Sequence, residues 1–319
     1  MINIDYKLLS KKYKNILVTG GLGFIGSAFI LRILEKISIN IFNIDKLDFK
    51  DNKFSFNNLF SKFHNRYKFF KINIHEKEKL RDVFKDIDPD IIFHFAAESH
   101  VDRSIDNPSV FIESNICGTF NLLEESLIHF KKLTLNRRKN FRFTHISTDE
   151  VYGSLNMEDD PFNENSKYSP RSPYSASKAA SDHLVNSWFH TYGLPTLITN
   201  CSNNFGPRQF PDKLIPNIIL NAIENKPIPI YGNGLNIRDW LYVEDHINAL
   251  LLLTLKAEDG SQYCVGGNKE ITNIKICNMI CNLLDEIIPK DSSYKSQIIY
   301  VNDRPGHDFR YSIDTNLIS

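Results

Sequence analysis

Three glycines spaced three residues apart lie between a β-branched run and an apolar helical pattern. Gly20, Gly23 and Gly26 follow the run ILVT and open the pattern at 24–37. Glycines are needed where a backbone turns tightly and approaches a pyrophosphate, whose charge then lies at the N-terminus of the following helix. This strand–turn–helix context predicts a dinucleotide-binding unit.

An acidic residue at the end of the next strand-like run indicates which dinucleotide is bound. Asp45 stands 19 residues beyond Gly26. A carboxylate at this place can accept hydrogen bonds from both ribose hydroxyls of an adenosine, and it repels a 2′-phosphate. The predicted cofactor is therefore NAD rather than NADP. The alternative, a glycine turn beside a helix-capping Asp, is disfavoured by the complete strand–turn–helix context.

Strand-like runs continue to alternate with helical patterns up to about residue 147. The runs lie at 15–20, 39–45, 67–74, 90–96 and 141–147, and the helical patterns lie near 24–37, 76–87 and 109–131. Strands that alternate with helices of this length form a parallel sheet covered on both faces. The expected fold class is α/β, a Rossmann-type doubly wound parallel sheet.

After about residue 205, frequent prolines divide the chain into shorter pieces. Helical patterns lie near 212–225, 243–256 and 271–287. We expect residues 15–205 to form an NAD-binding Rossmann domain with the catalytic residues. Residues 206–319 are expected to form mainly a smaller substrate-binding lobe over the carboxyl edge of the sheet, where open α/β folds bind ligands. The boundary is soft, because such lobes often exchange segments with the main sheet.

A tyrosine and a lysine stand one helical turn apart. Tyr174 and Lys178 follow Ser172 and Pro173, which suit an N-cap and a first helical residue. Residues i and i+4 share a helix face, so the phenol and the ammonium can point into one site. A nearby ammonium stabilises phenolate and so lowers the pKa of a tyrosine, which makes the tyrosine a usable base.

A hydroxyl and two acids end the fifth strand-like run. Thr148 can hold a substrate oxygen while Tyr174 takes its proton, but alcohol oxidation needs no carboxylate. Asp149 and Glu150 therefore suggest additional proton transfers. Crowding of like charges separates the pKa values of two carboxyl groups, so that one donates a proton and the other abstracts one. A solvated turn at the strand end is the alternative for this acidic pair.

Charge and composition exclude other classes of partner. Lys+Arg 38 and Asp+Glu 38 give a net charge of zero, which argues against nucleic acid and anionic lipid as partners. The longest strongly apolar run, 249–253, is too short to span a bilayer, and residues 1–14 lack the apolar core of a signal peptide. The 5 cysteines form neither a zinc pattern nor a disulfide framework. We expect a cytoplasmic protein without a metal site.

Longer strings around these residues resemble the extended short-chain dehydrogenase/reductases, and within them the branch that dehydrates dTDP-glucose. The strings are TGGLGFIGS (19–27), AAESHVDRSI (96–105), STDEVYG (147–153), YSASKAASDH (174–183), CSNNFGPRQFPDKLIP (201–216), RDWLYVEDH (238–246), YCVGG (263–267) and DRPGHDFRYSID (303–314). The combination of TDE with YxxxK is specific to the dehydratase branch, since related epimerases usually carry a serine motif without the acidic pair.

The resemblance implies a three-step, redox-neutral lyase reaction. Tyr174 deprotonates the glucosyl C4 hydroxyl while a hydride passes from C4 to NAD⁺, with Thr148 placing the oxygen and Lys178 assisting. Glu150 then removes the C5 proton, and Asp149 protonates the departing C6 hydroxyl. Return of the hydride to C6 gives dTDP-4-keto-6-deoxyglucose.

The resemblance also implies binding residues, position by position. Its NAD contacts are Gly20, Gly23, Phe24, Ile25, Gly26, Asp45, Lys46, Asn73, Ile74, Ala96, Ala97, Tyr174, Lys178 and Asn204. Its sugar-nucleotide contacts are Ser99, Thr148, Asn203, Lys213, Leu214, Tyr231, Arg238, Asn273, Asp303, Arg304 and His307. Arg238 and Arg304 suit a diphosphate, because a guanidinium binds phosphate oxygens in a bidentate manner. The alternative is a pair of surface or salt-bridged arginines.

Two departures from the family pattern bear on activity. Asn73 stands where the family usually has Asp, which weakens one acceptor for the adenine amino group. The family also continues past the position of Ser319 through a further helical segment, so turnover and stability are affected more than chemistry if that segment is missing. The alternatives are another nucleotide-sugar 4,6-dehydratase or an epimerase, and a truncated NAD-binding protein with little activity. The resemblance further implies a homodimer through the helices near 109–131 and 173–191.

Overall fold

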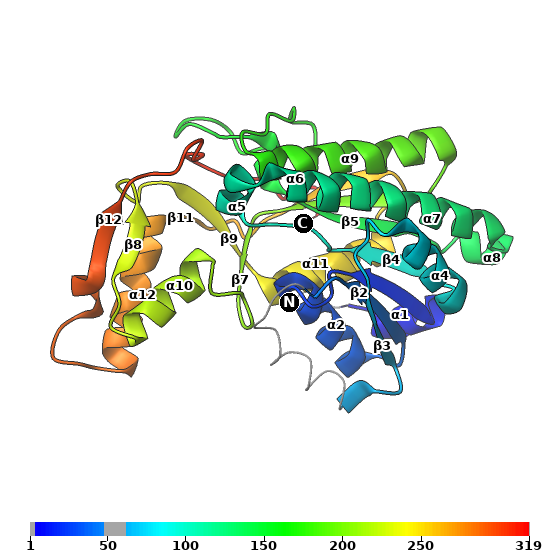
Figure 1. Ribbon diagram of the computed structural model, residues 1–319, viewed down its shortest axis with the longest axis horizontal. Coiled ribbons are helices and arrows are strands. Elements are labelled where there is room, and N and C mark those ends of the chain that lie inside the picture. Colours follow the sequence, from blue (N-terminus) through cyan, green and yellow to red (C-terminus); the bar gives the residue numbers. More distant parts are fainter. Residues whose placement is uncertain (1–3, 48–61, 319) are drawn as a thin grey trace.

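The main sheet is parallel throughout, as the alternation of strands and helices predicts. The computed structural model describes residues 4–47 and 62–318. Within these residues, a sheet of seven strands has the order β10-β6-β5-β4-β1-β2-β3 (Figure 1). Its strands are β1 (Asn15–Thr19), β2 (Asn40–Asp45), β3 (Tyr67–Lys71), β4 (Ile91–His94), β5 (Phe143–Thr148), β6 (Thr196–Cys201) and β10 (Ser261–Val265). The expected doubly wound α/β fold is confirmed.

Helices cover both faces of this sheet. One face packs against α2 (Phe24–Lys36) and α11 (Val243–Lys256), and short α1 (Tyr6–Lys12) joins the same core. The other face packs against α4 (Lys77–Ile87), α7 (Gly118–Lys132) and α9 (Pro173–Tyr192). Buried aliphatic and aromatic side chains fill both interfaces, which explains why the strands are apolar on both sides.

The helical pattern predicted near 109–131 is not one regular helix. It is divided into α6 (Pro108–Phe111), a π-helical turn (Ile112–Cys117) and α7, and it follows the short helix α5 (Val101–Asp106). The π turn places Asn115 against the loop after β4, where its Oδ1 accepts the Glu98 N–H (2.8 Å) and its Nδ2 donates to the Glu98 carbonyl (3.1 Å). Such single turns often occur at functional sites.

Most segments after residue 205 form a smaller lobe beside the carboxyl ends of the strands, at the left of Figure 1. It contains the helices α10 (Leu214–Ile223) and α12 (Asn273–Ile287) and two small sheets. The first sheet consists of β7 (Asn203–Phe205), β9 (Ile237–Tyr242) and β11 (Glu270–Thr272), and the second of β8 (Ile228–Tyr231) and β12 (Ile298–Val301). β10 and α11 return to the main sheet, so segments are exchanged, while the division at residue 205 stays a prediction.

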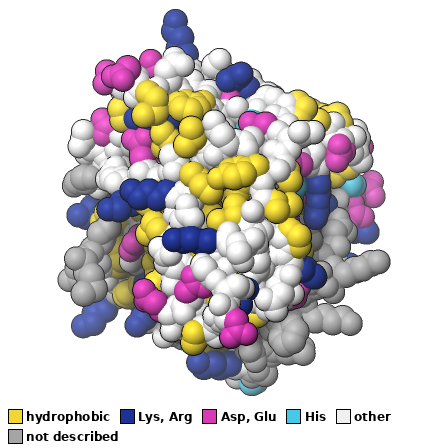
Figure 2. Space-filling view, turned by 90° about the vertical axis from the view of Figure 1, so that its left-hand side faces the viewer, with side chains coloured by type: hydrophobic (Ala, Val, Ile, Leu, Met, Phe, Trp, Pro, Cys, Tyr) yellow, Lys and Arg dark blue, Asp and Glu magenta, His cyan; other side chains and the backbone are white. Residues whose placement is uncertain are grey.

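Cys277 and Cys281 are buried in the core of the smaller lobe, between α10 and α12. The outer face of this lobe displays apolar side chains among charged ones (Figure 2). Among the exposed apolar residues of the lobe are Met279, Leu283 and Ile287 of α12. Across the described residues, no helix combines the length and the apolar character needed to cross a membrane. The same residues contain no group of His, Cys, Asp and Glu side chains that could hold a metal ion.

Candidate active site

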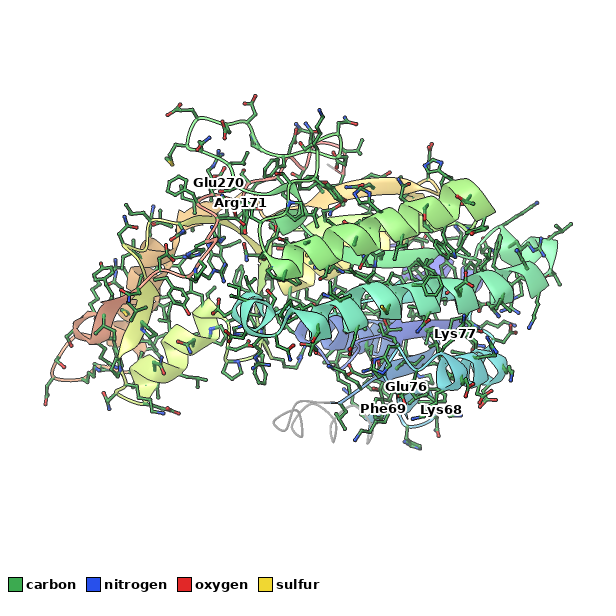
Figure 3. The ribbon with its side chains drawn as sticks, turned by 45° about the horizontal axis from the view of Figure 1, so that its top comes forward. Lys68, Phe69, Glu76, Lys77, Arg171 and Glu270 are labelled. Carbon is green, nitrogen blue, oxygen red and sulfur yellow. The ribbon has the colours of Figure 1, made fainter. Side chains whose placement is uncertain are left out.

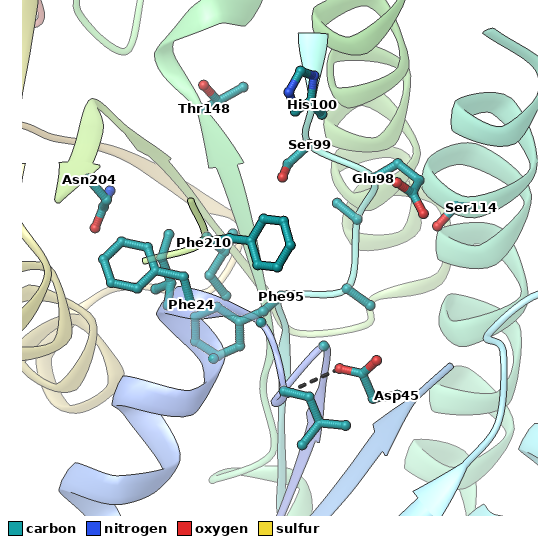
Figure 4. A pocket seen from close by; sticks show the side chains of 18 of the residues that line it. Phe24, Asp45, Phe95, Glu98, Ser99, His100, Ser114, Thr148, Asn204 and Phe210 are labelled. Carbon is teal, nitrogen blue, oxygen red and sulfur yellow. Dashed lines mark hydrogen bonds between the residues drawn. The ribbon is translucent and has the colours of Figure 1, made fainter. Parts of the chain in front are cut away.

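A cavity opens where the strand order reverses between β1 and β4, at the carboxyl ends of the strands (Figure 4). This is the crevice in which open parallel sheets bind their ligands. Asp45 lies toward one end of the cavity in the view and Thr148 toward the other. The structure brings together in its lining all residues predicted for catalysis and all those predicted for NAD.

The glycine turn after β1 leaves no space for a side chain. Gly20 has φ +72°, and a Cβ there would lie 2.5 Å from the backbone nitrogen of Ala96. A Cβ on Gly26 would lie 2.4 Å from the carbonyl oxygen of Gly20. The first turn of α2 therefore packs tightly against the loop, as a pyrophosphate site requires.

Gly26→Ala is expected to lower both NAD retention and thermal stability. The obstructing atoms are backbone, so the loop must move and its N–H groups lose their alignment; such a substitution costs more than about 1 kcal/mol. NAD released by denaturing the purified protein measures retention, and a melting curve measures stability. Gly193→Ala is the control, since nothing lies within 4 Å of a Cβ there and only its φ of +68° is strained. Normal NAD content in Gly26→Ala would contradict this assignment of the loop.

The acid at the end of β2 is held beside the glycine turn. Asp45 accepts the N–H of Leu22 through Oδ2 (3.0 Å) and the N–H of Leu47 through Oδ1 (3.1 Å). The neighbouring Lys46 forms an ion pair with Glu98 across the cavity. The glycine cradle and the adjacent carboxylate fit the pyrophosphate and the ribose hydroxyls of NAD. Asn73 lines the same end, and its Oδ1 accepts the His75 N–H (3.3 Å).

The helix with the tyrosine and the lysine begins with a complete capping box. Ser172 Oγ accepts the Ser175 N–H (3.0 Å), Ser175 Oγ accepts the Ser172 N–H (3.0 Å), and Pro173 occupies the first turn. This cap fixes where α9 starts, and it places Tyr174 in the first turn and Lys178 one turn later. Both side chains are buried and line the cavity.

Burial dominates the electrostatics of this pair. It raises the pKa of Tyr174 well above the ordinary value, and the negative charge of Glu150 adds to the rise, while a hydrogen bond with Thr148 opposes it. Burial lowers the pKa of Lys178, whose Nζ donates to the Ile146 carbonyl (2.8 Å). The lowered tyrosine pKa expected from the lysine is therefore wrong for this structure, because burial outweighs any such effect.

The two acids after β5 have different surroundings. Asp149 is 1% exposed, and burial followed by the charge of Glu150 raises its pKa well above the ordinary value. Burial also raises the pKa of Glu150, but the positive charges of Arg304, Arg238 and Lys213 oppose that rise. Asp149 is thus the better proton donor at neutral pH, and Glu150 is the better base. A solvated strand-end turn is excluded for this pair, because Asp149 is buried.

The residues predicted for the sugar nucleotide are divided between two places. Four line the cavity, namely Ser99, Thr148, Asn203 and Lys213. The others lie outside its lining, and they are Leu214, Tyr231, Arg238, Asn273, Asp303, Arg304 and His307. The positive charges of Arg304, Arg238 and Lys213 nevertheless act to lower the pKa of Glu150. These side chains of the lobe therefore lie near the acidic end of the cavity.

The two predicted diphosphate arginines are held differently. Arg238 is buried, stacks on the ring of Tyr311 (4.3 Å) and donates to the carbonyl oxygens of Ile237 (2.7 Å) and Asp308 (3.0 Å). Arg304 Nη1 pairs with Asp102 Oδ1 of α5 (3.2 Å). Arg304 is therefore salt-bridged, whereas Arg238 is buried and bound to backbone carbonyl oxygens.

Several cavity residues were not predicted. They are Leu22, Ser27, Ile44, Leu47, Ile72, Phe95, Glu98, His100, Arg103, Ser114, Ile146, Ser147, Cys201, Ser202, Arg208, Gln209, Phe210 and Asp212. Many of them stand inside the strings AAESHVDRSI and CSNNFGPRQFPDKLIP, whose density of polar and aromatic residues was the available signal. His100 and Asp212 are 3.6 Å apart and join the two strings across the cavity.

The sequence is similar to one known family and to several characterised dehydratases. The family described as GDP-mannose 4,6 dehydratase matches residues 17–319. The dTDP-glucose 4,6-dehydratase of Salmonella typhimurium is 51% identical over 312 residues, which cover 95% of this chain and 86% of that protein. The dTDP-glucose 4,6-dehydratase of Neisseria gonorrhoeae is 49% identical over 305 residues, which cover 94% of this chain and 88% of that protein.

Solved structures agree with these matches. A dTDP-glucose 4,6-dehydratase from Streptomyces venezuelae, with NAD and dTDP bound, has a TM-score of 0.84 and 36% identity, and the match covers 95% of this chain and 89% of that one. A dTDP-glucose 4,6-dehydratase from Bacillus anthracis in complex with NAD has a TM-score of 0.81 and 39% identity, with 96% and 89% of the two chains covered.

Proposed function

The chain belongs to the GDP-mannose 4,6 dehydratase family, and we propose that it converts dTDP-glucose to dTDP-4-keto-6-deoxyglucose with NAD as its cofactor. The observation that carries this function is the meeting of Thr148, Asp149 and Glu150 with Tyr174 and Lys178 in one cavity beside a glycine cradle. Epimerisation at C4 needs no such acidic pair, so the pair favours elimination of water.

The first group of residues removes a proton from the sugar. NAD bound in the cradle supplies a reversible hydride acceptor. Tyr174 takes the proton of the C4 hydroxyl, and Thr148, which lies at the end of β5 in the same lining, orients that oxygen. Lys178 stabilises the phenolate from the next turn of α9.

The second group eliminates water from the resulting 4-ketone. Glu150 removes the proton at C5, which the neighbouring ketone makes acidic, and Asp149 donates its proton to the departing C6 hydroxyl. The pKa directions match these roles, because Asp149 is buried next to a second carboxyl and Glu150 faces three cations. Thr148 Oγ1 donates to Asp149 Oδ1 (3.1 Å), which holds the acid close to the place of the sugar.

The smaller lobe supplies the groups that suit a nucleoside diphosphate. Arg238, Arg304 and Lys213 give positive charge near the acidic end of the cavity, and guanidinium groups bind phosphate oxygens in a bidentate manner. Incubation with dTDP-, UDP- and CDP-glucose tests the base preference. The fastest formation of a 4-keto-6-deoxy product is expected with dTDP-glucose, and faster turnover of either other sugar nucleotide would contradict that choice.

We also propose that two copies of the chain form a homodimer through α7 and α9. These helices lie side by side on one face of the molecule (Figure 3). Apolar side chains remain partly exposed along the π turn and α7, including Ile112 (45% exposed) and Phe120 (39% exposed). Pairing of this face with a second copy would remove that apolar surface from water.

The dimer is expected to separate when a charge is placed in this face. Light scattering behind a sizing column should give about twice 36.9 kDa for the wild type and a smaller mass for Ile112→Arg. Leu135→Arg on α8 (Leu135–Arg138) is the matched control, because Leu135 is 76% exposed but lies beyond α7. A wild-type mass near 36.9 kDa would exclude this dimer.

A cytoplasmic location is likewise a proposal. Its support is that all five cysteines, which lie within the described residues, are free thiols. Free buried thiols such as Cys201 and Cys264 are usual in a reducing compartment. The free thiols therefore support a location inside the cell.

A further inference from the structure

Beneath the proposed catalytic pair lies a buried carboxylate that the reaction scheme does not use. Asp182 stands on α9 one turn after Lys178, which itself stands one turn after Tyr174. All three side chains thus share one stripe of the helix. Asp182 is 2% exposed and lies on the sheet side of Lys178 rather than in the lining of the cavity.

The hydrogen bonds of Asp182 identify it as an ionised carboxylate. Its Oδ2 accepts from Ser147 Oγ (2.7 Å), from Tyr168 OH (2.8 Å) and from Asn200 Nδ2 (3.2 Å). An ionised carboxylate only accepts hydrogen bonds, so several donors on one oxygen favour the charged form. Burial raises the pKa of Asp182, but His145, then the charge of Lys178 and the hydrogen bond from Ser147 outweigh burial and hold this pKa below its ordinary value.

The other oxygen of this carboxylate faces the lysine through a histidine. Asp182 Oδ1 lies 3.1 Å from His145 Nε2, and the same Nε2 lies 3.4 Å from Lys178 Nζ. Burial, and then the charge of Lys178, lower the pKa of His145 to about 4, so this histidine is neutral at pH 7. The two charges on either side of it are therefore those of Asp182 and Lys178.

We propose that Asp182 is a positioning residue whose negative charge balances the buried ammonium of Lys178 and so keeps that group protonated where it donates to the Ile146 carbonyl, one helical turn from Tyr174. The proposal deepens the proposed function, on which it rests. A buried charge is costly unless an opposite charge compensates it, and removing one partner leaves the other uncompensated. Lys178 keeps its proton, and hence its effect on Tyr174, only while Asp182 is charged.

The neighbouring titratable groups leave Asp182 as the source of this compensation. Those that face Lys178 from the elements packed around it are His94 of β4, His145 of β5, Cys201 of β6, and Tyr174 and Asp182 of α9. Burial lowers the pKa of His94 well below its ordinary value and raises that of Cys201 to about 12. Both are therefore neutral near pH 7, as is Tyr174.

The test measures the pH dependence of sugar oxidation alone. Rapid mixing of the NAD-loaded enzyme with dTDP-glucose gives the initial rise of NADH absorbance, which precedes the elimination step assigned to Asp149 and Glu150. In Asp182→Asn, the ammonium loses its partner and releases its proton more readily. The rate of NADH formation falls at high pH where Lys178 loses its proton, and this alkaline limb of the pH–rate profile should therefore move to lower pH by about 1–3 units. An unmoved limb in a folded Asp182→Asn protein overturns the proposal.

Tyr168→Phe is the matched control, because it removes one hydrogen bond from the same carboxylate and leaves the charge in place. Its alkaline limb should stay where it is in the wild type, even if the rate falls. A shift of equal size in Tyr168→Phe would show that packing, rather than charge, sets the limb. If the wild type itself forms no NADH, the proposed function is contradicted. This outcome separates failure of the proposed function from failure of the proposal for Asp182.

A stability cycle decides the case in which Asp182→Asn folds but is too unstable for the rate measurement. Lys178→Met removes the charge that Asp182 balances, so the double variant Lys178→Met/Asp182→Asn should melt at a higher temperature than Asp182→Asn alone. A carboxylate that merely joins α9 to β5 and β6 gives no such rescue. A double variant that is no more stable than Asp182→Asn therefore overturns the proposal.

Discussion

Glu150→Gln is expected to reduce product formation by about 10²–10⁴-fold while leaving sugar oxidation in place. The amide has the size of the carboxyl group but cannot remove the proton at C5. Mixing this variant with dTDP-glucose should therefore produce a lasting NADH absorbance, because the hydride is held while elimination fails. The wild type should show this absorbance only briefly.

The physical reason lies in the surroundings of Glu150. The positive charges of Arg304, Arg238 and Lys213 oppose the effect of burial on its pKa, so the side chain can act as a base near neutral pH. Asp149→Asn removes the proton donor and should cause the same accumulation. Glu98→Gln is the control, because Glu98 lines the cavity but pairs with Lys46 at the NAD end. Wild-type turnover in Glu150→Gln would refute its role as the base.

Tyr174→Phe is expected to abolish the rise of NADH absorbance as well as product formation, again by about 10²–10⁴-fold. Removal of the hydroxyl leaves the C4 proton without an acceptor, so the reaction stops before any hydride moves. The side chain is 8% exposed and phenylalanine fits the same space, so the melting temperature should change little.

Tyr152→Phe is the matched control for this variant. Tyr152 is also buried near the end of β5, but its hydroxyl contacts Gln262 Nε2 (2.8 Å) and lies outside the cavity lining. Its oxidation step should remain close to that of the wild type. Together, Tyr174→Phe and Glu150→Gln test whether the first group of residues acts with the first hydride transfer and the second group acts after it. NADH formation at the wild-type rate in Tyr174→Phe would exclude the tyrosine as the first base.

The first five strands could be predicted because each carries its own local pattern. The runs of β-branched and aromatic residues match β1 to β5 closely, and the glycine turn identifies the start of α2. In the smaller lobe, the helical patterns near 212–225 and 271–287 match α10 and α12, but the strands of this lobe gave no comparable signal. Its strands are only three to six residues long, and they pair across long stretches of sequence, as β12 does with β8. The return of β10 to β6 likewise depends on tertiary packing rather than local propensity.

The candidate site shows the same division between local and long-range information. Thr148, Asp149 and Glu150 are adjacent in sequence, and Tyr174 and Lys178 are one turn apart, so their joint role could be predicted. Asp182 and His145 could not, because their contact exists only where α9 packs on β5. The ion pair of Arg304 with Asp102 similarly joins residues 202 positions apart.

The most direct measurement of the central claim is an assay of the purified protein with dTDP-glucose and no added NAD, followed by the alkali-induced absorbance of the 4-keto-6-deoxy sugar. The account predicts product from the wild type, because the cavity retains NAD and each turnover returns the hydride that it removes. It predicts little product from Asp149→Asn and Glu150→Gln. If folded wild-type protein forms no product, even with added NAD and with UDP- or CDP-glucose, the chain is an NAD-binding protein rather than a dehydratase.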